Sequence, residues 1–375
     1  MNGKRIASKL DYQLSVINRR KEIARHIMED SLVNGRLVPL SETQKRAVEK
    51  VWGERKQFYD WRWFELYNWE YSEIGIDIWK FIPIDYWLTY IDPLFAHPIN
   101  GLVFDDKNMY DLYFPDVKQP RTVVRYIDGC FMDAGYHIIG EEDALKLCEE
   151  ARNVVIKPAI GTCGGRGIAF WSGENSTHEE LKQFFKNRSC YIVQEVVRQH
   201  PIMASLNESS CNTIRMLSFL HEGEVVVIPT AFTRFGGKGS LIDNVSSGGY
   251  CAGIDSEGII SSISRNHFEE RVETPGANET RVIPNYSKCQ SIARQVAPRL
   301  SHITKLVAWD FAIDEDSEPL LIEVNFERTS IQSFQALNGP IFGDYVEYFL
   351  QKVTNHYVPK NPLYRGLVKM MSKMK

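Results

Sequence analysis

The hydrophobic pattern divides the chain into two regions of different periodicity. In roughly the first hundred residues the apolar positions recur at helical spacing and fall on one face, as do Leu14, Ile17, Ile23, Ile27 and Leu32. Ser41-Glu42 carries the signature of a helix start, and a second helix is predicted from there to about Gln57. From about Lys107 onward, short apolar runs alternate with helical patterns. The pattern therefore predicts a helical N-terminal region followed by an α+β body.

Aromatic side chains are concentrated between residues 58 and 95, where Pro83 and Pro93 interrupt the helical pattern. This belt contains Trp61, Trp63, Phe64, Tyr67, Trp69, Tyr71, Trp79 and Trp87. Packing of a helical lobe is the favoured interpretation, because large aromatic side chains dominate the energetics of cores. The alternative is a stacking platform for bases or sugars, although stacking sites for nucleic acid usually come with basic residues.

The body is predicted to consist of short strands, three helices and two hairpins. The helices are expected over residues 141–152, 177–187 and 285–302, and the strands over 154–157, 168–171 and 191–194. The first hairpin joins residues 213–220 to 225–235, and the second joins 305–314 to 319–326. Glycine-rich segments follow the strand 154–157 and the first hairpin, at 161–167 and 236–249. From these elements we predict a helical region at 1–105, two α+β subdomains at 106–200 and 201–358, and a basic tail at 359–375.

Composition narrows the class of protein. The 375 residues are 43% hydrophobic, which is sufficient for a large core, and the net charge of -4 gives no basic footprint for nucleic acid. The N-terminus lacks the apolar run of a secretion signal, and no apolar stretch is long enough to span a bilayer. The 7 cysteines are scattered without a C-x-x-C pair, which indicates reduced thiols. A cytoplasmic location is expected.

The second hairpin brings three oxygen-bearing side chains together. Its turn is centred between Asp316 and Ser317, so a symmetric register places Asp310 opposite Glu323, with Asn325 on the same face. Two opposed carboxylates between apolar strands are destabilising unless a cation lies between them. Oxygen ligands that leave room for water and phosphates suit Mg2+. The alternative is a chance arrangement on a solvated hairpin face, and a register slip of one residue would remove the convergence.

Lys157 stands directly before the glycine-rich segment 161–167. Glycines allow backbone N–H groups to approach phosphate oxygens, and a lysine supplies a positive charge. The segment is not a Walker A loop or a dinucleotide fingerprint, and the order of lysine and glycines is the reverse of that in protein kinases. Further on, the apolar strand from Tyr191 runs into Gln194 and Glu195 and could present an adenine edge, or it could simply end in solvent.

Four features follow one another along the chain: Lys157, the glycine-rich segment 161–167, the string Gln194-Glu195-Val196-Val197, and the hairpin with Asp310, Glu323 and Asn325. This ordered set resembles the ATP-grasp superfamily, whose two α+β subdomains close on ATP and magnesium. The resemblance covers the chain from about Lys107 to its end. It implies that Lys157 and Lys107 contact phosphates and that the loop forms a lid. The residues that it implies for ATP binding are Lys107, Lys157, Gly164, Gly165, Gly167, Gln194, Glu195, Val197 and His200, and those for Mg2+ are Asp310, Glu323 and Asn325.

More narrowly, several short strings resemble the sugar-transfer associated ATP-grasp family, which is linked with bacterial polysaccharide biosynthesis. They include Asn212-Thr213-Ile214-Arg215, Arg234-Phe235-Gly236, Asp243-Asn244 and Trp309-Asp310. Many ATP-grasp ligases carry an arginine just before the metal aspartate, whereas this chain has Ala308 and Trp309. The resemblance therefore implies that Arg215 or Arg234 performs the catalytic role of that arginine, and that Asp243 and Asn244 face the substrate.

The implied activity is that of a carboxylate–amine ligase that uses ATP and Mg2+ and acts through an acyl phosphate on a sugar or amino-acid substrate, either a small molecule or glycan-linked. The alternatives are a phosphotransferase on the same scaffold and a non-catalytic nucleotide-binding regulator. Since a ligase of this kind needs no covalent nucleophile, Cys163 is expected to be a small loop residue. The basic tail is expected to be a solvated end, with weak contact to an anionic membrane as the alternative.

Overall fold

The computed structural model describes residues 22, 24–71, 75–96, 104–160, 165–186, 190–266, 271–276, 278–326 and 329–357. Two compact units make up the chain: unit 1 is formed by residues 1–97 and 330–375, and unit 2 by residues 98–329. Every helix in the described part of the chain is too short or too polar to cross a membrane. The predicted basic tail at 359–375 lies outside the described residues, as do Leu14, Ile17 and Ile23.

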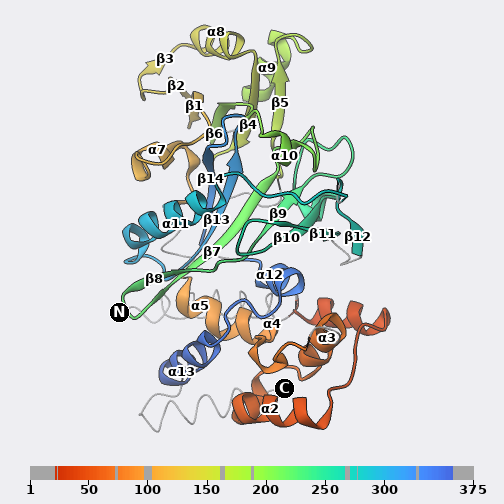
Figure 1. Ribbon diagram of the computed structural model, residues 1–375. Helices are drawn as coiled ribbons and strands as arrows, with labels where there is room; N and C mark the ends of the chain where they lie inside the picture. The colour runs from red at the N-terminus through yellow and green to blue at the C-terminus, as the bar shows by residue number, and fades with distance from the viewer. Residues whose placement is uncertain are drawn as a thin grey trace. The chain divides into compact units, whose positions relative to one another are not determined.

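Unit 1 is helical, as the sequence predicted. Its helices are α2 (Glu42–Trp52), α3 (Arg62–Tyr71), α4 (Ile84–Tyr86), α5 (Asp92–Phe95), α12 (Ile331–Asn338) and α13 (Tyr345–Tyr357) (Figure 1). Short 3-10 helices at Gly53–Phe58 and Ile78–Lys80 and a π-helix at Trp87–Ile91 connect them. The predicted helix start is confirmed, because Ser41 and Gln44 form a capping box before α2. The helix continues past Trp52 as the 3-10 turn.

The aromatic belt forms the core of unit 1. Trp52, which is fully buried, makes edge contacts with Tyr59, Phe64 and Tyr86. Tyr67 stacks on Phe81 with ring centroids 4.3 Å apart. The packing interpretation of the belt is therefore confirmed, although Trp61, Trp69 and Trp79 are only partly buried. The first predicted helix differs from expectation, since Leu32 is 53% exposed and the buried positions among its described residues are Ala24, Met28 and Ser31.

Two antiparallel sheets form unit 2, which confirms the α+β class. The first sheet has the order β3-β2-β1-β6-β4-β5, with β1 (Thr122–Ile127), β2 (Cys130–Met132), β3 (Ile138–Ile139), β4 (Asn153–Pro158), β5 (Ala169–Ser172) and β6 (Cys190–Glu195). Helices α8 (Glu141–Ala151) and α9 (His178–Lys186) cover one of its faces (Figure 1). Thr177 and Glu180 form the expected capping contacts at the start of α9.

The second sheet has the order β12-β11-β10-β9-β7-β13-β14, with β8 paired to β7. Its strands are β7 (Thr213–His221), β8 (Glu224–Val227), β9 (Ala231–Phe235), β10 (Tyr250–Ile254), β11 (Ile260–Arg265), β12 (Arg271–Glu273), β13 (Leu306–Ile313) and β14 (Pro319–Asn325). Helix α11 (Tyr286–Leu300) packs on it, and α7 (Tyr110–Tyr113) and α10 (Pro201–Ala204) are short (Figure 1). The predicted first hairpin is divided into β8 and β9 at Pro229, which has no N–H to donate to β7.

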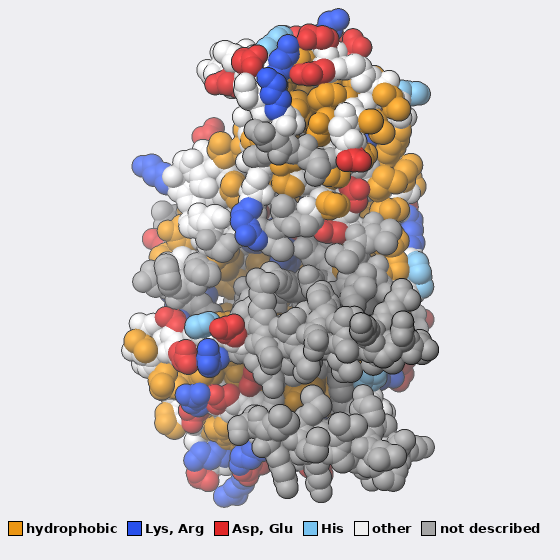
Figure 2. All heavy atoms as spheres, turned by 180° about the vertical axis from the view of Figure 1, so that it is seen from behind, with side chains coloured by type: hydrophobic (Ala, Val, Ile, Leu, Met, Phe, Trp, Pro, Cys, Tyr) orange, Lys and Arg blue, Asp and Glu red, His pale blue; other side chains and the backbone are white. Residues whose placement is uncertain are grey.

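The surface of the described residues carries charges of both signs. On the face shown in Figure 2, basic and acidic side chains lie among one another. This distribution agrees with the net charge of -4. It lacks the single basic field by which nucleic acids are usually bound, as far as the described residues of that face extend.

Candidate functional site

The hairpin of β13 and β14 pairs Asp310 with Glu323, which is the predicted register. Near the turn the pairing differs by one residue from the symmetric expectation, because Ile313 pairs with Pro319 and Phe311 with Leu321. An irregularity between Asp310 and Phe311 then restores the expected pairing. The convergence of the two carboxylates therefore depends on this bulge as well as on the turn.

Asp310 is fully buried and is bound by two arginines from neighbouring strands. Arg215 on β7 donates from Nε to Oδ1 at 2.7 Å and from Nη2 to Oδ2 at 2.6 Å, as a bidentate pair. Arg234 on β9 donates to Oδ2 at 2.9 Å, and the Asn325 side chain donates to the same oxygen at 3.1 Å. The sequence predicted a metal ion between the opposed carboxylates, and in the structure the guanidinium groups of Arg215 and Arg234 neutralise Asp310.

Glu323 is neutralised separately, by Lys107. Lys107 Nζ lies 2.8 Å from Glu323 Oε1, and the two side chains are 12% and 24% exposed. The segment carrying Lys107 is held at the end of β4, because the backbone N–H of Lys107 donates to the carbonyl of Ala159, the residue directly after that strand. The structure thus brings Lys107, one of the two lysines expected to contact phosphates, into the same group as the predicted metal ligands.

We call Lys107, Arg215, Arg234, Asp243, Asp310, Glu323 and Asn325 the charged cluster. Burial by itself would raise the pKa of Asp310, but Arg215 and Arg234 more than offset this and hold it at about 2. Burial would likewise raise the pKa of Glu323, and the ammonium of Lys107 lowers it below its ordinary value. Both carboxylates are therefore ionised at neutral pH, with their charges balanced inside the protein.

Asp243 joins this cluster through Thr213. Thr213 Oγ1 donates to Asp243 Oδ2 at 2.5 Å and accepts from Arg234 Nη2 at 3.0 Å. Asp243 Oδ2 also lies 3.6 Å from Arg234 Nε. Burial raises the pKa of Asp243, and the charge of Arg234 opposes that shift. Asn244, its predicted companion, contributes its backbone carbonyl, which accepts from the N–H groups of Ser247 and Gly249.

Lys157 lies on β4 in the first sheet, together with Gln194 of β6. Lys157 Nζ donates to Gln194 Oε1 at 3.0 Å, and Gln194 donates in turn to the carbonyl of Pro120 at 3.3 Å. Burial lowers the pKa of Lys157 from its ordinary value. Two of the residues predicted for nucleotide binding are therefore in direct contact.

The side chains of Glu195, Val197 and His200, which were also predicted to bind ATP, do not contact Lys157 or Gln194 in the hydrogen bonds of the described residues. Glu195 follows Gln194 on the strand, so its side chain leaves the opposite face, where it pairs with Arg121. Val197 is partly buried beyond the end of β6. His200 caps α10, since its Nδ1 accepts from the Ile202 N–H at 3.2 Å, and its own N–H donates to Ile313 on β13.

The two glycine-rich loops meet in the structure. Gly164 lies outside the described residues, but Gly165 has a φ of +71° and packs so closely on Ile242 that an added Cβ would lie 2.5 Å from its Cγ2. Gly167 has a φ of +81°, and an added Cβ would lie 2.9 Å from Pro158. Both positions require glycine for conformation and for space.

Sequence reasoning did not select the polar residues that hold the second loop. The Gly236 N–H donates to Ser210 Oγ at 3.1 Å, and the Asn207 side chain donates to the carbonyls of Gly237 and Ser240. Asn212, which is fully buried, donates to the carbonyls of Met203 and Asn207. The available signal was a run of small polar residues directly before the apolar strand β7.

The donor chemistry of the cluster fits a hard divalent cation. Asp310, Glu323 and Asn325 supply oxygen ligands from one hairpin face, as Mg2+ prefers. No group of three or more His, Cys, Asp or Glu side chains in the described part of the chain is arranged to hold a metal ion. A metal bound by this hairpin would therefore complete its coordination with water and phosphate oxygens. To bind Oδ2 of Asp310 it would have to displace an N–H group, because that oxygen accepts three hydrogen bonds and Oδ1 accepts one.

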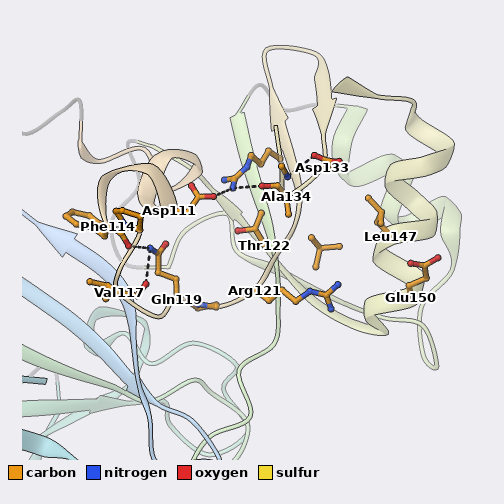
Figure 3. A pocket seen from close by; sticks show the side chains of 15 residues that line it. Asp111, Phe114, Val117, Gln119, Arg121, Thr122, Asp133, Ala134, Leu147 and Glu150 are labelled. Atoms are coloured by element: carbon orange, nitrogen blue, oxygen red, sulfur yellow. Dashed lines mark hydrogen bonds and ion pairs between the residues drawn. The ribbon is translucent and has the colours of Figure 1, made fainter. Parts of the chain in front are cut away.

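A separate cavity of about 520 Å³ lies at the start of β1. In Figure 3 it is enclosed by the segment of Phe114 and Gln119, by Arg121 and Thr122, and by Leu147 and Glu150 of α8. No residue of the charged cluster lines it. Its wall is nevertheless connected to a residue predicted for nucleotide binding, because the Gln194 side chain donates to the carbonyl of Pro120.

A sequence profile of sugar-transfer associated ATP-grasp proteins matches residues 101–347, more than half of the chain. No curated protein matches this chain. Among solved structures, a D-cycloserine synthetase is 14% identical with a TM-score of 0.40, covering 68% of this chain and 73% of its own. D-Alanyl-alanine synthetase A from Vibrio cholerae is 11% identical with a TM-score of 0.38, covering 69% and 65%. Biotin carboxylase from Campylobacter jejuni is 14% identical with a TM-score of 0.41, covering 70% and 48%.

Proposed function

This chain belongs to the sugar-transfer associated ATP-grasp family, and on that premise we propose that it is an ATP- and Mg2+-dependent carboxylate–amine ligase. The observation that carries the proposal is the charged cluster, in which arginines suited to phosphates on β9 and β7 lie beside carboxylates suited to a metal on β13 and β14. A buried set of charges is costly to maintain and is weak evidence for stability, so a function is the better explanation. We further propose a sugar or amino-acid substrate connected with polysaccharide biosynthesis.

In the proposed reaction, a substrate carboxylate attacks the γ-phosphorus of ATP, the bond to the β-γ bridging oxygen breaks, and ADP leaves. An acyl phosphate results. An amine then attacks the acyl carbon, phosphate leaves, and the amine loses a proton as the amide forms. A bound Mg2+ would be held by Asp310, Glu323 and Asn325 and would offset the charge of the phosphates.

The protein's own cations have defined tasks in this scheme. Lys157 and Lys107 bind phosphate oxygens, and the planar guanidinium groups of Arg215 and Arg234 donate N–H groups to the charge that develops on the transferred phosphoryl group. Gly165, packed on Ile242, belongs to a cover that keeps water from the acyl phosphate. Asp243 and Thr213 orient Arg234 from its other side.

Hydroxylamine trapping tests the proposal directly. The full-length protein is incubated with ATP, Mg2+, hydroxylamine and a panel of uronic acids and amino acids, and hydroxamate and phosphate release are measured. A ligase produces hydroxamate in an amount that matches the phosphate released, because hydroxylamine intercepts the acyl phosphate. If a stable phosphorylated product accumulates in its place, the protein is the alternative phosphotransferase and the ligase proposal is wrong.

A further inference from the structure

We propose that Arg215, Arg234 and Lys107 determine which form of the metal the site accepts: the metal–nucleotide complex binds, and a bare divalent cation is excluded. The inference rests on the proposed function, since it concerns the same site. The three cations are the specificity-determining residues: they pair with the carboxylates of Asp310 and Glu323 until phosphate oxygens replace these carboxylates as their partners.

The hydrogen-bond donors around Asp310 are the first observation that supports the inference. Each oxygen of an ionised carboxylate offers two lone pairs; Asp310 accepts three hydrogen bonds at Oδ2 and one at Oδ1, and three of the four come from arginines. The side chain is fully buried, so water does not compete for these positions. A metal ion at Oδ2 would have to displace an N–H group, and one at Oδ1 would lie beside the Nε–H of Arg215.

Charge balance is the second step. The carboxylates of Asp310, Glu323 and Asp243 stand against Arg215, Arg234 and Lys107, so the cluster is neutral when all of these groups are ionised. A bare divalent cation would add positive charge to a buried, balanced site and leave the displaced cations unpaired, which is strongly unfavourable. A metal–nucleotide complex carries net negative charge, so it brings new partners for them.

The positions of Arg215 and Arg234 allow each guanidinium group to exchange Asp310 for a phosphate group. Arg215 is the strand partner of Asp310, and Arg234 is the strand partner of Thr213, so both guanidinium groups start from fixed backbone positions. Arg234 would keep Thr213 Oγ1 and the nearby carboxylate of Asp243 after leaving Asp310. A guanidinium also matches phosphate oxygens in a bidentate manner, so each arginine can exchange a carboxylate for a phosphate.

Glu323 is the point at which the exchange can begin. It is held through one oxygen by Lys107 and is a quarter exposed, at 24%. Asp310 is fully buried by comparison. The metal of an arriving complex would meet Glu323 first, while its phosphates attract Lys107.

Mn2+ binding tests the inference without any turnover. The amplitude of the free Mn2+ signal in electron paramagnetic resonance measures its affinity for the full-length protein. Wild type should bind bare Mn2+ weakly. Arg234→Met should bind it at least about tenfold more tightly, because one cation is removed from Asp310. Arg299→Met is the matched control: Arg299 pairs with Asp116 on the surface, with both side chains 39% exposed, and its loss should change nothing.

Two further measurements keep the test decisive. Lys107→Met, which frees Glu323, should tighten bare Mn2+ binding as well, and it replaces Arg234→Met if that variant does not unfold cooperatively. In wild type, ADP binding by equilibrium dialysis should strengthen at least about tenfold on adding Mn2+, because the coupling between two ligands is reciprocal. Unchanged bare Mn2+ affinity in both variants would overturn the inference and leave the ligase proposal intact. Absence of metal-dependent ADP binding would overturn both.

Discussion

Asp85 in unit 1 and Asp310 in unit 2 are carboxylates that the protein treats in opposite ways. Burial raises the pKa of Asp85 to about 7, although the N–H groups of Asp60 and Tyr86 donate to it. At Asp310 burial acts in the same direction, yet Arg215 and Arg234 lower the pKa. Unit 1 thus favours a neutral acid near physiological pH, whereas unit 2 maintains a buried charge with paired cations.

The difference extends to the remaining polar groups of each unit. The buried Gln335 of unit 1 is neutral and fully engaged: it accepts from the Ile82 N–H and donates to Tyr67 Oη and to the Ile82 carbonyl, each at 2.9 Å. A neutral hub of this kind stabilises a fold at little electrostatic cost. Desolvating buried charges can cost more than their pairing returns, so their presence in unit 2 supports the proposal that this unit contains the active site.

The largest effect is expected where that comparison is strongest, at Glu323. Glu323→Gln keeps the shape of the side chain but removes the charge that balances Lys107, so ATP turnover with Mg2+ should fall about a thousandfold. Steady-state phosphate release measures it. Glu315→Gln, at the exposed turn of the same hairpin, should retain full turnover. Undiminished activity of the Glu323 variant would exclude this residue from the metal site.

In unit 1 the corresponding change is Gln335→Ala, which leaves the buried Ile82 N–H without an acceptor. The free energy of unfolding should fall by about 3 kcal/mol, while ADP affinity stays unchanged. Urea denaturation followed by tryptophan fluorescence suits this test, because unit 1 contains Trp52, Trp61, Trp63, Trp69, Trp79 and Trp87. Gln351→Ala on the exposed side of α13 is the control, and a loss of ADP affinity in the Gln335 variant would contradict the division of roles.

The pH dependence of unit 1 is a third test, with an effect of about 2 kcal/mol. Between about pH 4 and 7 the unfolded chain releases the proton of Asp85, whereas the folded chain retains it. Stability should therefore fall as pH rises through this window. The slope should be smaller in Asp85→Asn than in wild type, and equal to wild type in Asp77→Asn, whose side chain is exposed. Parallel profiles for wild type and Asp85→Asn would show that Asp85 is ionised throughout.

The smallest effect concerns the contact between the two loops of unit 2. Gly165→Ala should weaken ADP binding by about 1 kcal/mol, because the new Cβ meets Ile242 and the φ is positive. Gly239→Ala is the control, because Gly239 has a similar φ of +75° but no atom close to the position of the new Cβ. It therefore measures the effect of backbone strain without the effect of a side-chain contact. The double variant Gly165→Ala/Ile242→Ala should recover part of the loss. Equal losses in the single and double variants would mean that the loop contact plays no role in binding.

Local features of the chain could be predicted from the sequence with good accuracy. The capping box at Ser41 and the helix and strand spans of the body depend on neighbouring residues, so the printed pattern contains the information. The pairing of Asp310 with Glu323 could be predicted by counting residues outward from the turn between them. The bulge at Ile322 could not be predicted by such a count.

Contacts over long separations were decided by the tertiary structure. Arg215 reaches Asp310 because β7 pairs with β13, and Lys107 reaches Glu323 from a segment far earlier in the chain. The helices α12 and α13 likewise belong to unit 1 although they follow the last strand of unit 2. The sequence by itself determined the type of side chains available and the local elements that carry them. Which cation neutralises which carboxylate depends on strand order, and strand order is set by the burial of whole faces rather than by any short stretch of residues.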